Sequence, residues 1–243
     1  MATSFLLVHG GSSTGRFWDR LLPHLDAPAL AVDLPGRAGK PADMMELSIE
    51  DCVASVLTDV RAARLDGEFV VVAHSSGGLI VPGLVAGLDG PVRHIVLNAA
   101  SVPPEGGCGL DCMQPRHRDG VELLVTAARR DGQVVTTPLP DDPEKLRTSY
   151  GETLDDETLA FIADPARIVS DSFNLYFQAV RWSQVGDTPV TYVRNRRDRP
   201  IPPALQDEMI GRLRNPIVVD LDRGHVPAVS HPEEFAAICN GVL

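Results

Sequence analysis

The chain has 243 residues, of which 44% are hydrophobic and 23% are charged, and its formal net charge at pH 7 is −11. This length and balance predict one large globular domain, or one domain with a sizeable insertion, and exclude a globally disordered chain. The negative charge repels a phosphate backbone and the apolar runs are too short to cross a bilayer, so we expect neither a nucleic-acid nor a membrane partner.

Short aliphatic or β-branched runs of strand length recur along the chain, each followed by Gly or Pro and then by helical spacing. They cover residues 5–8, 29–32, 69–73, 94–97, 190–193 and 217–221. Ser48, with Asp51 three residues later, predicts a capping box that starts a helix between the second and third runs. Continuous apolar strands that alternate with helices predict an α/β fold, with about six mostly parallel strands and helices on both faces.

The alternation breaks once, because about 90 residues separate the fourth run from the fifth, far more than an ordinary connection needs. Within this stretch, residues 121–130, 155–163 and 172–182 have helical patterning. We therefore expect a helical cap inserted after the fourth strand. The predicted division is a core formed by residues 1–98 and 186–243, and a cap formed by residues 99–185.

Residues 69–80 combine a buried strand, a tight turn with Ser75 at its apex, and a predicted helix. Ala73 and Gly77 flank Ser75 two positions away, which gives the small-x-Ser-x-Gly pattern of a nucleophile elbow. These neighbours must be small because the backbone of the central residue is strained. The helix is expected to direct its first N–H groups at negative charge on a reacting carbonyl. An ordinary turn with no catalytic role can have the same composition, so a catalytic interpretation of Ser75 also requires partner residues.

Two candidate partners for Ser75 follow the last two predicted strands, in the chain order Ser, Asp, His that a nucleophile elbow of this type requires. Asp198 lies in the loop after the fifth run, and His225 lies in the loop after the sixth. The carboxyl ends of parallel strands share one edge of the sheet, so these side chains are expected beside Ser75. His74 is expected to point away as the variable residue of the turn, and His231 is expected to cap a helix.

The first strand runs into a His-Gly-Gly-Ser-Ser loop at residues 9–13. A glycine-rich loop at this place supplies the second amide of an oxyanion hole, so the Gly11 and Ser76 amides are the predicted pair. A phosphate-binding loop is the alternative, but it lacks the following Lys and the G-x-G-x-x-G spacing. His9 is expected to be a hydrogen-bonded scaffold residue.

The N-terminal residues and the cysteines give two further expectations. Residues 1–5 carry no basic leader, hydrophobic signal segment or small-residue cleavage site, which predicts a cytoplasmic protein. Cys108, Cys112 and His117 lie close together in the sequence but lack a fourth ligand and a standard zinc spacing. We therefore predict free thiols and no metal site.

Together, these motifs resemble the α/β-hydrolase superfamily over essentially the whole chain. The resemblance rests on residues 5–11, 31–36, 69–80, 224–225 and 231–233. Residues 16–18 and 226–232 are similar to those of the compact group that contains plant methyl esterases and hydroxynitrile lyases. The resemblance implies an α/β-hydrolase fold with Ser75, Asp198 and His225 as a catalytic triad.

Departures from this group favour an esterase over a lyase. The lyases have Thr where this chain has Gly10, and Lys where it has Val226, and both serve cyanohydrin chemistry. Ala73 replaces the usual leading Gly of the elbow. A haloalkane dehalogenase would carry Asp as its nucleophile, which Ser75 excludes.

The predicted function is hydrolysis of a carboxylic ester or lactone through an acyl-enzyme, without a metal or organic cofactor. The substrate is expected to be a small or medium, largely apolar molecule, and a homodimer is possible. The predicted pocket residues are Phe17, Trp18, Leu110, Met113, Leu124, Phe161, Phe173, Tyr176, Phe177 and Trp182. The alternatives are a receptor-like protein with little turnover, and another reaction on the same scaffold, such as amide, thioester or carbon–carbon cleavage, hydroxynitrile lysis or cofactor-free oxygenation.

Overall fold

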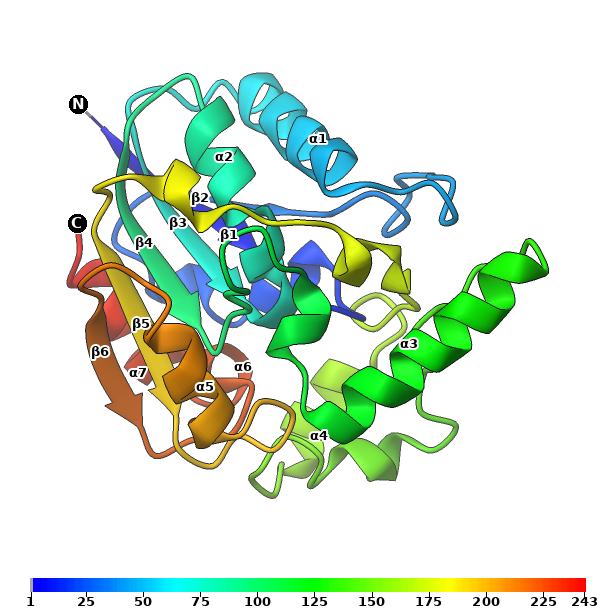
Figure 1. Cartoon of the computed structure of the whole chain (residues 1–243). Coiled ribbons are helices and arrows are strands. Elements are labelled where there is room, and N and C mark those ends of the chain that lie inside the picture. Colours follow the sequence, from blue (N-terminus) through cyan, green and yellow to red (C-terminus); the bar gives the residue numbers. More distant parts are fainter. Residues whose placement is uncertain (1) are drawn as a thin grey trace.

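A six-stranded sheet in the order β2-β1-β3-β4-β5-β6 forms the centre of the computed structural model in Figure 1, which describes residues 2–243. Each neighbouring pair of strands is parallel, so the predicted sheet is confirmed. The strands are β1 (Thr3–Val8), β2 (Ala29–Val32), β3 (Glu68–His74), β4 (Val92–Asn98), β5 (Val190–Asn195) and β6 (Ile217–Leu221). The helices are α1 (Ile49–Ala62), α2 (Val81–Gly87), α3 (Pro115–Arg130), α4 (Asp156–Ala163), α5 (Pro203–Ile210), α6 (Pro227–Ser230) and α7 (Pro232–Asn240).

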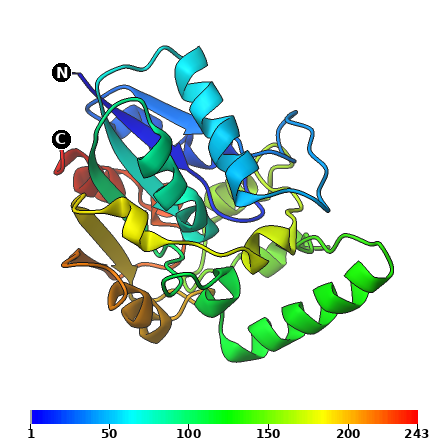
Figure 2. The same cartoon turned by 45° about the horizontal axis from the view of Figure 1, so that its top comes forward.

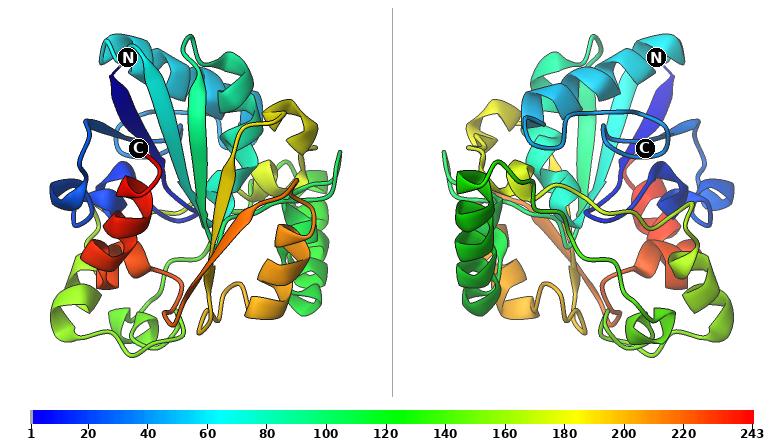
Figure 3. Two further views of the ribbon diagram at one scale, coloured as in Figure 1. Left: turned by 90° about the vertical axis from the view of Figure 1, so that its left-hand side faces the viewer. Right: turned by 90° about the vertical axis from the view of Figure 1, so that its right-hand side faces the viewer.

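Alternate side chains of each central strand enter two separate cores, one on each face of the sheet. Val71 of β3 packs with α1 and α2 in one core. Val70 and Val72 pack with α7 and with Trp18 in the other. Figure 3 shows the sheet between these two layers of helices. Burial on both faces explains why the strands read as continuous apolar runs.

The Ser48 capping box is formed as predicted, since its side chain accepts from the Asp51 amide and Asp51 accepts from the Ser48 amide.

Along the sheet, β3, β4 and β5 extend past their apolar runs to end at His74, Asn98 and Asn195. These polar residues still pair in the parallel ladder, where His74 is in register with Asn98. Apolar patterning therefore ends before the strands do.

Helices α3 and α4 lie beyond the carboxyl ends of the strands (Figure 1), and α3 projects away from the rest of the chain (Figures 1 and 2). The predicted helix over residues 172–182 is wrong: short 3-10 turns at Phe173–Phe177 and Trp182–Val185 are separated by extended backbone. The Asn174 and Gln178 amides bond to backbone groups of residues 44–49 instead, which competes with a regular helix. Residues 99–185 are our proposed cap.

An extended part of this segment is joined to the loop after β1. Ser13 and Ile168 form an antiparallel bridge, and the Val169 amide donates to the Ser12 carbonyl at 3.1 Å. The Thr14 hydroxyl donates to the Ala166 carbonyl at 2.8 Å. The proposed cap is thus held to the first loop of the core by backbone hydrogen bonds and by one bond from the Thr14 hydroxyl.

A buried ion pair lies beneath this junction. Arg37, in the loop after β2, pairs with Asp171 of the cap segment, and their side chains are 1% and 2% exposed. Burial raises the pKa of Asp171, while the positive charge of Arg37 acts in the opposite direction.

Among residues 2–243, no helix combines the length and the apolar character needed to cross a bilayer.

Replacing Arg37 by Met leaves Asp171 as an uncompensated buried charge, and we expect a loss of about 3–5 kcal/mol in the free energy of unfolding. The double variant R37M/D171L, which removes both charges, should recover most of that loss. Urea unfolding at pH 7 measures both effects. Arg61→Met, which breaks an exposed pair with Asp89, is the control and should change little. An Arg37→Met effect no larger than the control would contradict the burial of the Arg37–Asp171 pair.

Candidate active site

Ser75 follows β3 with a φ angle of 51°, so its backbone is in the left-handed region that non-glycine residues rarely adopt. A Cβ atom at Gly77 would lie 2.6 Å from the His9 carbonyl oxygen, and a Cβ atom at Gly10 would lie 2.9 Å from Ser75 Cβ. Both positions therefore require glycine because the β1 loop approaches the turn so closely. The predicted helix after the turn is present, first as a 3-10 helix over Ser75–Ile80 and then as α2.

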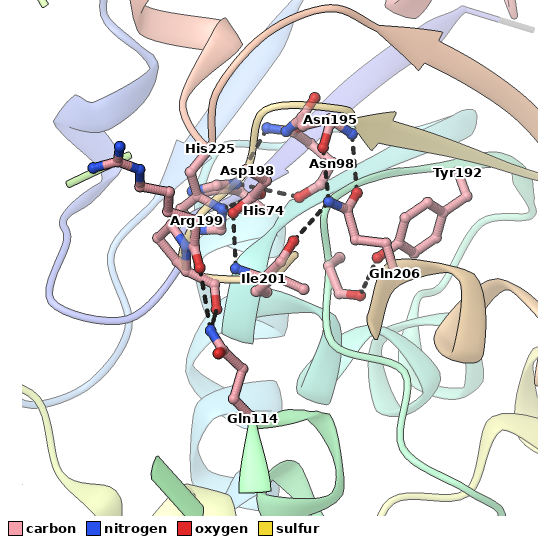
Figure 4. Close-up of polar contacts among 12 residues, drawn as sticks. His74, Asn98, Gln114, Tyr192, Asn195, Asp198, Arg199, Ile201, Gln206 and His225 are labelled. Atoms are coloured by element: carbon pink, nitrogen blue, oxygen red, sulfur yellow. Dashed lines mark hydrogen bonds and ion pairs between the residues drawn. The ribbon is translucent and has the colours of Figure 1, made fainter. Parts of the chain in front are cut away.

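His225 and Asp198 are joined by a hydrogen bond of 2.6 Å between Nδ1 and Oδ2. Their side chains are 7% and 0% exposed. The other carboxylate oxygen of Asp198 accepts from the Ile201 amide at 2.8 Å (Figure 4). The His225 amide donates to the Tyr150 carbonyl at 2.7 Å. A carboxylate at Nδ1 favours the tautomer whose Nε2 can accept a proton. His225 and Ser75 line the same cavity.

The two predicted oxyanion amides come from adjacent segments. A Cβ atom on Gly11 would lie 3.2 Å from Ser76 Oγ, so the β1 loop contacts the turn at this point. Within residues 2–243, neither amide donates to a backbone carbonyl. Two unengaged N–H groups beside Ser75 form an arrangement that can accept a developing negative charge.

Ser75 borders two cavities, and six of the predicted pocket residues line them. The smaller cavity, of about 240 Å³, includes Phe17 and Phe161 in its wall. The larger cavity, of about 640 Å³, lies against α3 and is lined by Met113, Leu124, Phe173 and Tyr176. Both walls are mainly apolar, which suits an apolar ligand.

The other four predicted pocket residues lie elsewhere, and we no longer assign them to the pocket. Trp18 is fully buried against Phe235, and Trp182 and Leu110 are also buried away from both cavities. Phe177 lies under the Arg129 guanidinium, 4.8 Å from its ring centre. Large apolar side chains fill the core as readily as a pocket, and composition does not separate these roles.

His74 is a part of the site that the sequence reasoning missed. Its ring stacks on Phe17 at 4.8 Å and lies 4.5 Å from the ring of His225, measured between centroids. Asn98 Nδ2 lies 3.1 Å from His74 Nδ1, and Asn195 donates to Asn98 Oδ1 at 2.9 Å (Figure 4). A polar residue at the end of each of three neighbouring strands was the available signal.

Two buried histidines are held neutral. Burial lowers the pKa of His9 to about 3, with a smaller contribution from the Arg37 charge. Burial and then the charge of His225 hold the pKa of His74 well below its usual range. His9 accepts from the Leu34 amide at 3.3 Å, in agreement with the expected scaffold role.

The cysteine prediction agrees with the structure in one respect, since Cys52, Cys108, Cys112 and Cys239 are all free thiols. Over residues 2–243, no cluster of three or more His, Cys, Asp or Glu side chains could hold a metal ion.

Comparison with known proteins agrees with the fold described above. The sequence profile of the Alpha/beta hydrolase family matches residues 5–238. Lipase LipV of Mycobacterium tuberculosis is 26% identical over 260 residues, covering 98% of this chain and 92% of that protein. A pyrethroid hydrolase of Sphingobium wenxiniae is 26% identical over 261 residues, covering 96% and 85%. An extracellular alpha/beta-hydrolase from a Paenibacillus species has the same fold, with a TM-score of 0.80, 18% identity and coverage of 99% and 98%.

The low pKa values of His9 and His74 predict that the protein loses stability as the pH falls below about 6.5, the ordinary imidazole pKa. In that range the unfolded chain takes up protons that the folded chain does not bind. Each histidine contributes up to about 1.4 kcal/mol per pH unit. Urea unfolding between about pH 6.5 and pH 5, before most carboxylates titrate, checks the slope. Stability that is constant over this range would contradict the prediction.

Proposed function

Because the chain belongs to the Alpha/beta hydrolase family, we propose that it is a serine carboxylesterase that cleaves a small or medium, largely apolar ester or lactone. The observation that carries the proposal is the 2.6 Å hydrogen bond from His225 Nδ1 to Asp198 Oδ2, with His225 and Ser75 in one cavity wall. A hydroxyl, an imidazole and a buried carboxylate in this order are the groups that acyl transfer requires.

In the first half of the reaction, Asp198 orients the imidazole and His225 Nε2 takes the proton from Ser75 Oγ. The serine oxygen attacks the ester carbonyl, and the Gly11 and Ser76 amides stabilise the resulting oxyanion. When the tetrahedral intermediate collapses, the carbon–oxygen bond to the alcohol breaks. His225 then returns its proton to the leaving alcohol, and the acyl group stays on Ser75.

In the second half, water replaces the alcohol. His225 removes a proton from the water, whose oxygen attacks the acyl carbonyl, and the carbon–oxygen bond to Ser75 breaks. The serine regains its proton from His225, and the carboxylic acid leaves. This cycle uses side chains and backbone amides alone.

His74 supports the same chemistry in a positioning role. It stacks on the ring of Phe17 and adjoins the ring of His225, so it limits the orientations open to the imidazole. The uncharged state of His74 matters because a second positive charge at this distance would oppose the imidazolium that forms during the reaction.

Ser75→Ala should lower kcat for p-nitrophenyl esters of short and medium chain length by more than about 10⁴-fold, because the attacking oxygen is lost. Asp198→Asn should cause a loss of about 10⁴-fold through the wrong imidazole tautomer. Release of p-nitrophenol by identically prepared proteins measures both effects.

Ser183→Ala, which removes an exposed hydroxyl on another part of the surface, is the matched control and should keep full activity. Equal turnover by the wild type and Ser75→Ala would contradict the role of Ser75. No turnover by either protein would contradict ester hydrolysis and favour ligand binding without turnover or a different reaction.

A further inference from the structure

If Ser75 acts as proposed above, one cavity receives the alcohol half of the ester and the other receives the acyl half. Ser75 borders both cavities, whereas His225 borders only the smaller one. The leaving alcohol must lie on the side of His225 because it takes its proton from that imidazole. The acyl group therefore extends from Ser75 into the larger cavity against α3.

Two hydroxyl groups lie at the inner end of the larger cavity. Tyr176 and Ser76 both line it, next to Ser75. A Cβ atom on Gly11 would lie 2.9 Å from Tyr176 Oη and 3.2 Å from Ser76 Oγ, so both oxygens adjoin the Gly11 α-carbon. The Gly11 and Ser76 amides are the proposed oxyanion donors. The two hydroxyls consequently lie close to the position that the scissile carbonyl would occupy.

Of the two O–H groups of Tyr176 and Ser76, at least one has no acceptor within residues 2–243. Tyr176 Oη and Ser76 Oγ adjoin the same atom, and a hydrogen bond between the two hydroxyls would use only one of their two O–H groups. In the part of the chain that the structure describes, hydrogen bonds from these hydroxyls to other groups are absent. The nearest carboxylate, Asp171, pairs with Arg37 through Oδ1, and its Oδ2 would lie 3.6 Å from a Cβ atom on Gly11. One O–H group is thus available to a molecule in the cavity.

The surroundings make that donor selective. The larger cavity is also lined by Met113, Leu124, Phe173 and Ile201, which offer no side-chain hydrogen bond of comparable strength, and by the polar side chains of Ser101, Gln114, Arg116 and His117. Burial and the charge of Asp171 raise the pKa of Tyr176 to about 12, so the phenol keeps its proton. A plain alkyl chain would leave the donor unpaired next to the reacting bond, and this has an energetic cost.

We propose that Tyr176 determines specificity for the acyl half of the substrate by donating a hydrogen bond to an acceptor atom next to the scissile carbonyl. The substrate class that fits is an ester of an apolar acid with an oxygen on its α-carbon, such as an α-alkoxy or α-keto acid. This inference rests on ester hydrolysis at Ser75 and adds the chemistry of the acyl group.

The test compares p-nitrophenyl methoxyacetate with p-nitrophenyl butyrate, whose acyl chains have the same number of heavy atoms. The ratio of their kcat/KM values is divided by the ratio of their rates with hydroxide, which removes the difference in intrinsic reactivity. We expect the corrected ratio to be about 3 to 10 for the wild type, the size of one neutral hydrogen bond. Tyr176→Phe should bring the corrected ratio close to 1, because the phenolic donor is lost.

Tyr192→Phe is the matched control, because Tyr192 donates to the Ala100 carbonyl at 3.1 Å and borders neither cavity. It should keep the wild-type ratio. A corrected ratio of 1 in an active wild type overturns this inference alone, without needing any variant. An equal loss on both esters in Tyr176→Phe also overturns it, since the phenol would then serve the oxyanion or the fold.

Failure of the proposed esterase function would give a different experimental result. If the wild type hydrolyses neither ester and a fluorophosphonate does not label Ser75, both the esterase proposal and the role of Tyr176 are wrong. Labelling of Ser75 together with a corrected ratio between about 3 and 10 that is lost only in Tyr176→Phe supports both.

Discussion

Close packing between the loop after β1 and the turn after β3 is the constraint on which the rest of the site depends. The positive φ angle of Ser75 is maintained because Gly10 and Gly77 let the two backbones approach to distances that a side chain would forbid. That approach brings the Gly11 and Ser76 amides together. Backbone strain at one residue thus orients the proposed nucleophile and its two proposed amide donors at the same time.

The polar ends of β3, β4 and β5 give this edge of the sheet its rigidity. His74, Asn98 and Asn195 form a buried chain of hydrogen bonds, which Gln206 closes by bonding to the Asn195 backbone. The apolar interior lies on one side of this layer and the cavities on the other. Buried polar networks favour the arrangement that pairs most of their polar groups, and in this one Asn195 Oδ1 has no partner among residues 2–243.

The sequence was sufficient for features that depend on local patterning: the strands, the Ser48 capping box, and the order of Ser75, Asp198 and His225 along the chain. It was insufficient where distant segments compete. Residues 172–182 have helical spacing, but Asn174 and Gln178 bond to the backbone before α1 instead. For the same reason Trp18 could not be separated from Phe17 in advance, since burial depends on what packs against each ring.

The hydrogen bonds that join the cap to the loop after β1 limit how freely the two parts can be exchanged. Ser13 bridges Ile168 and Ser12 accepts from Val169, so the cap supplies part of the backbone support of the loop that carries Gly11. A chimaera that receives the cap of a relative must reproduce this short antiparallel contact as well as a new pocket. The proposed cap is therefore part of the structural support of the loop that carries Gly11, and an exchange of residues 99–185 would alter the pocket and this loop together.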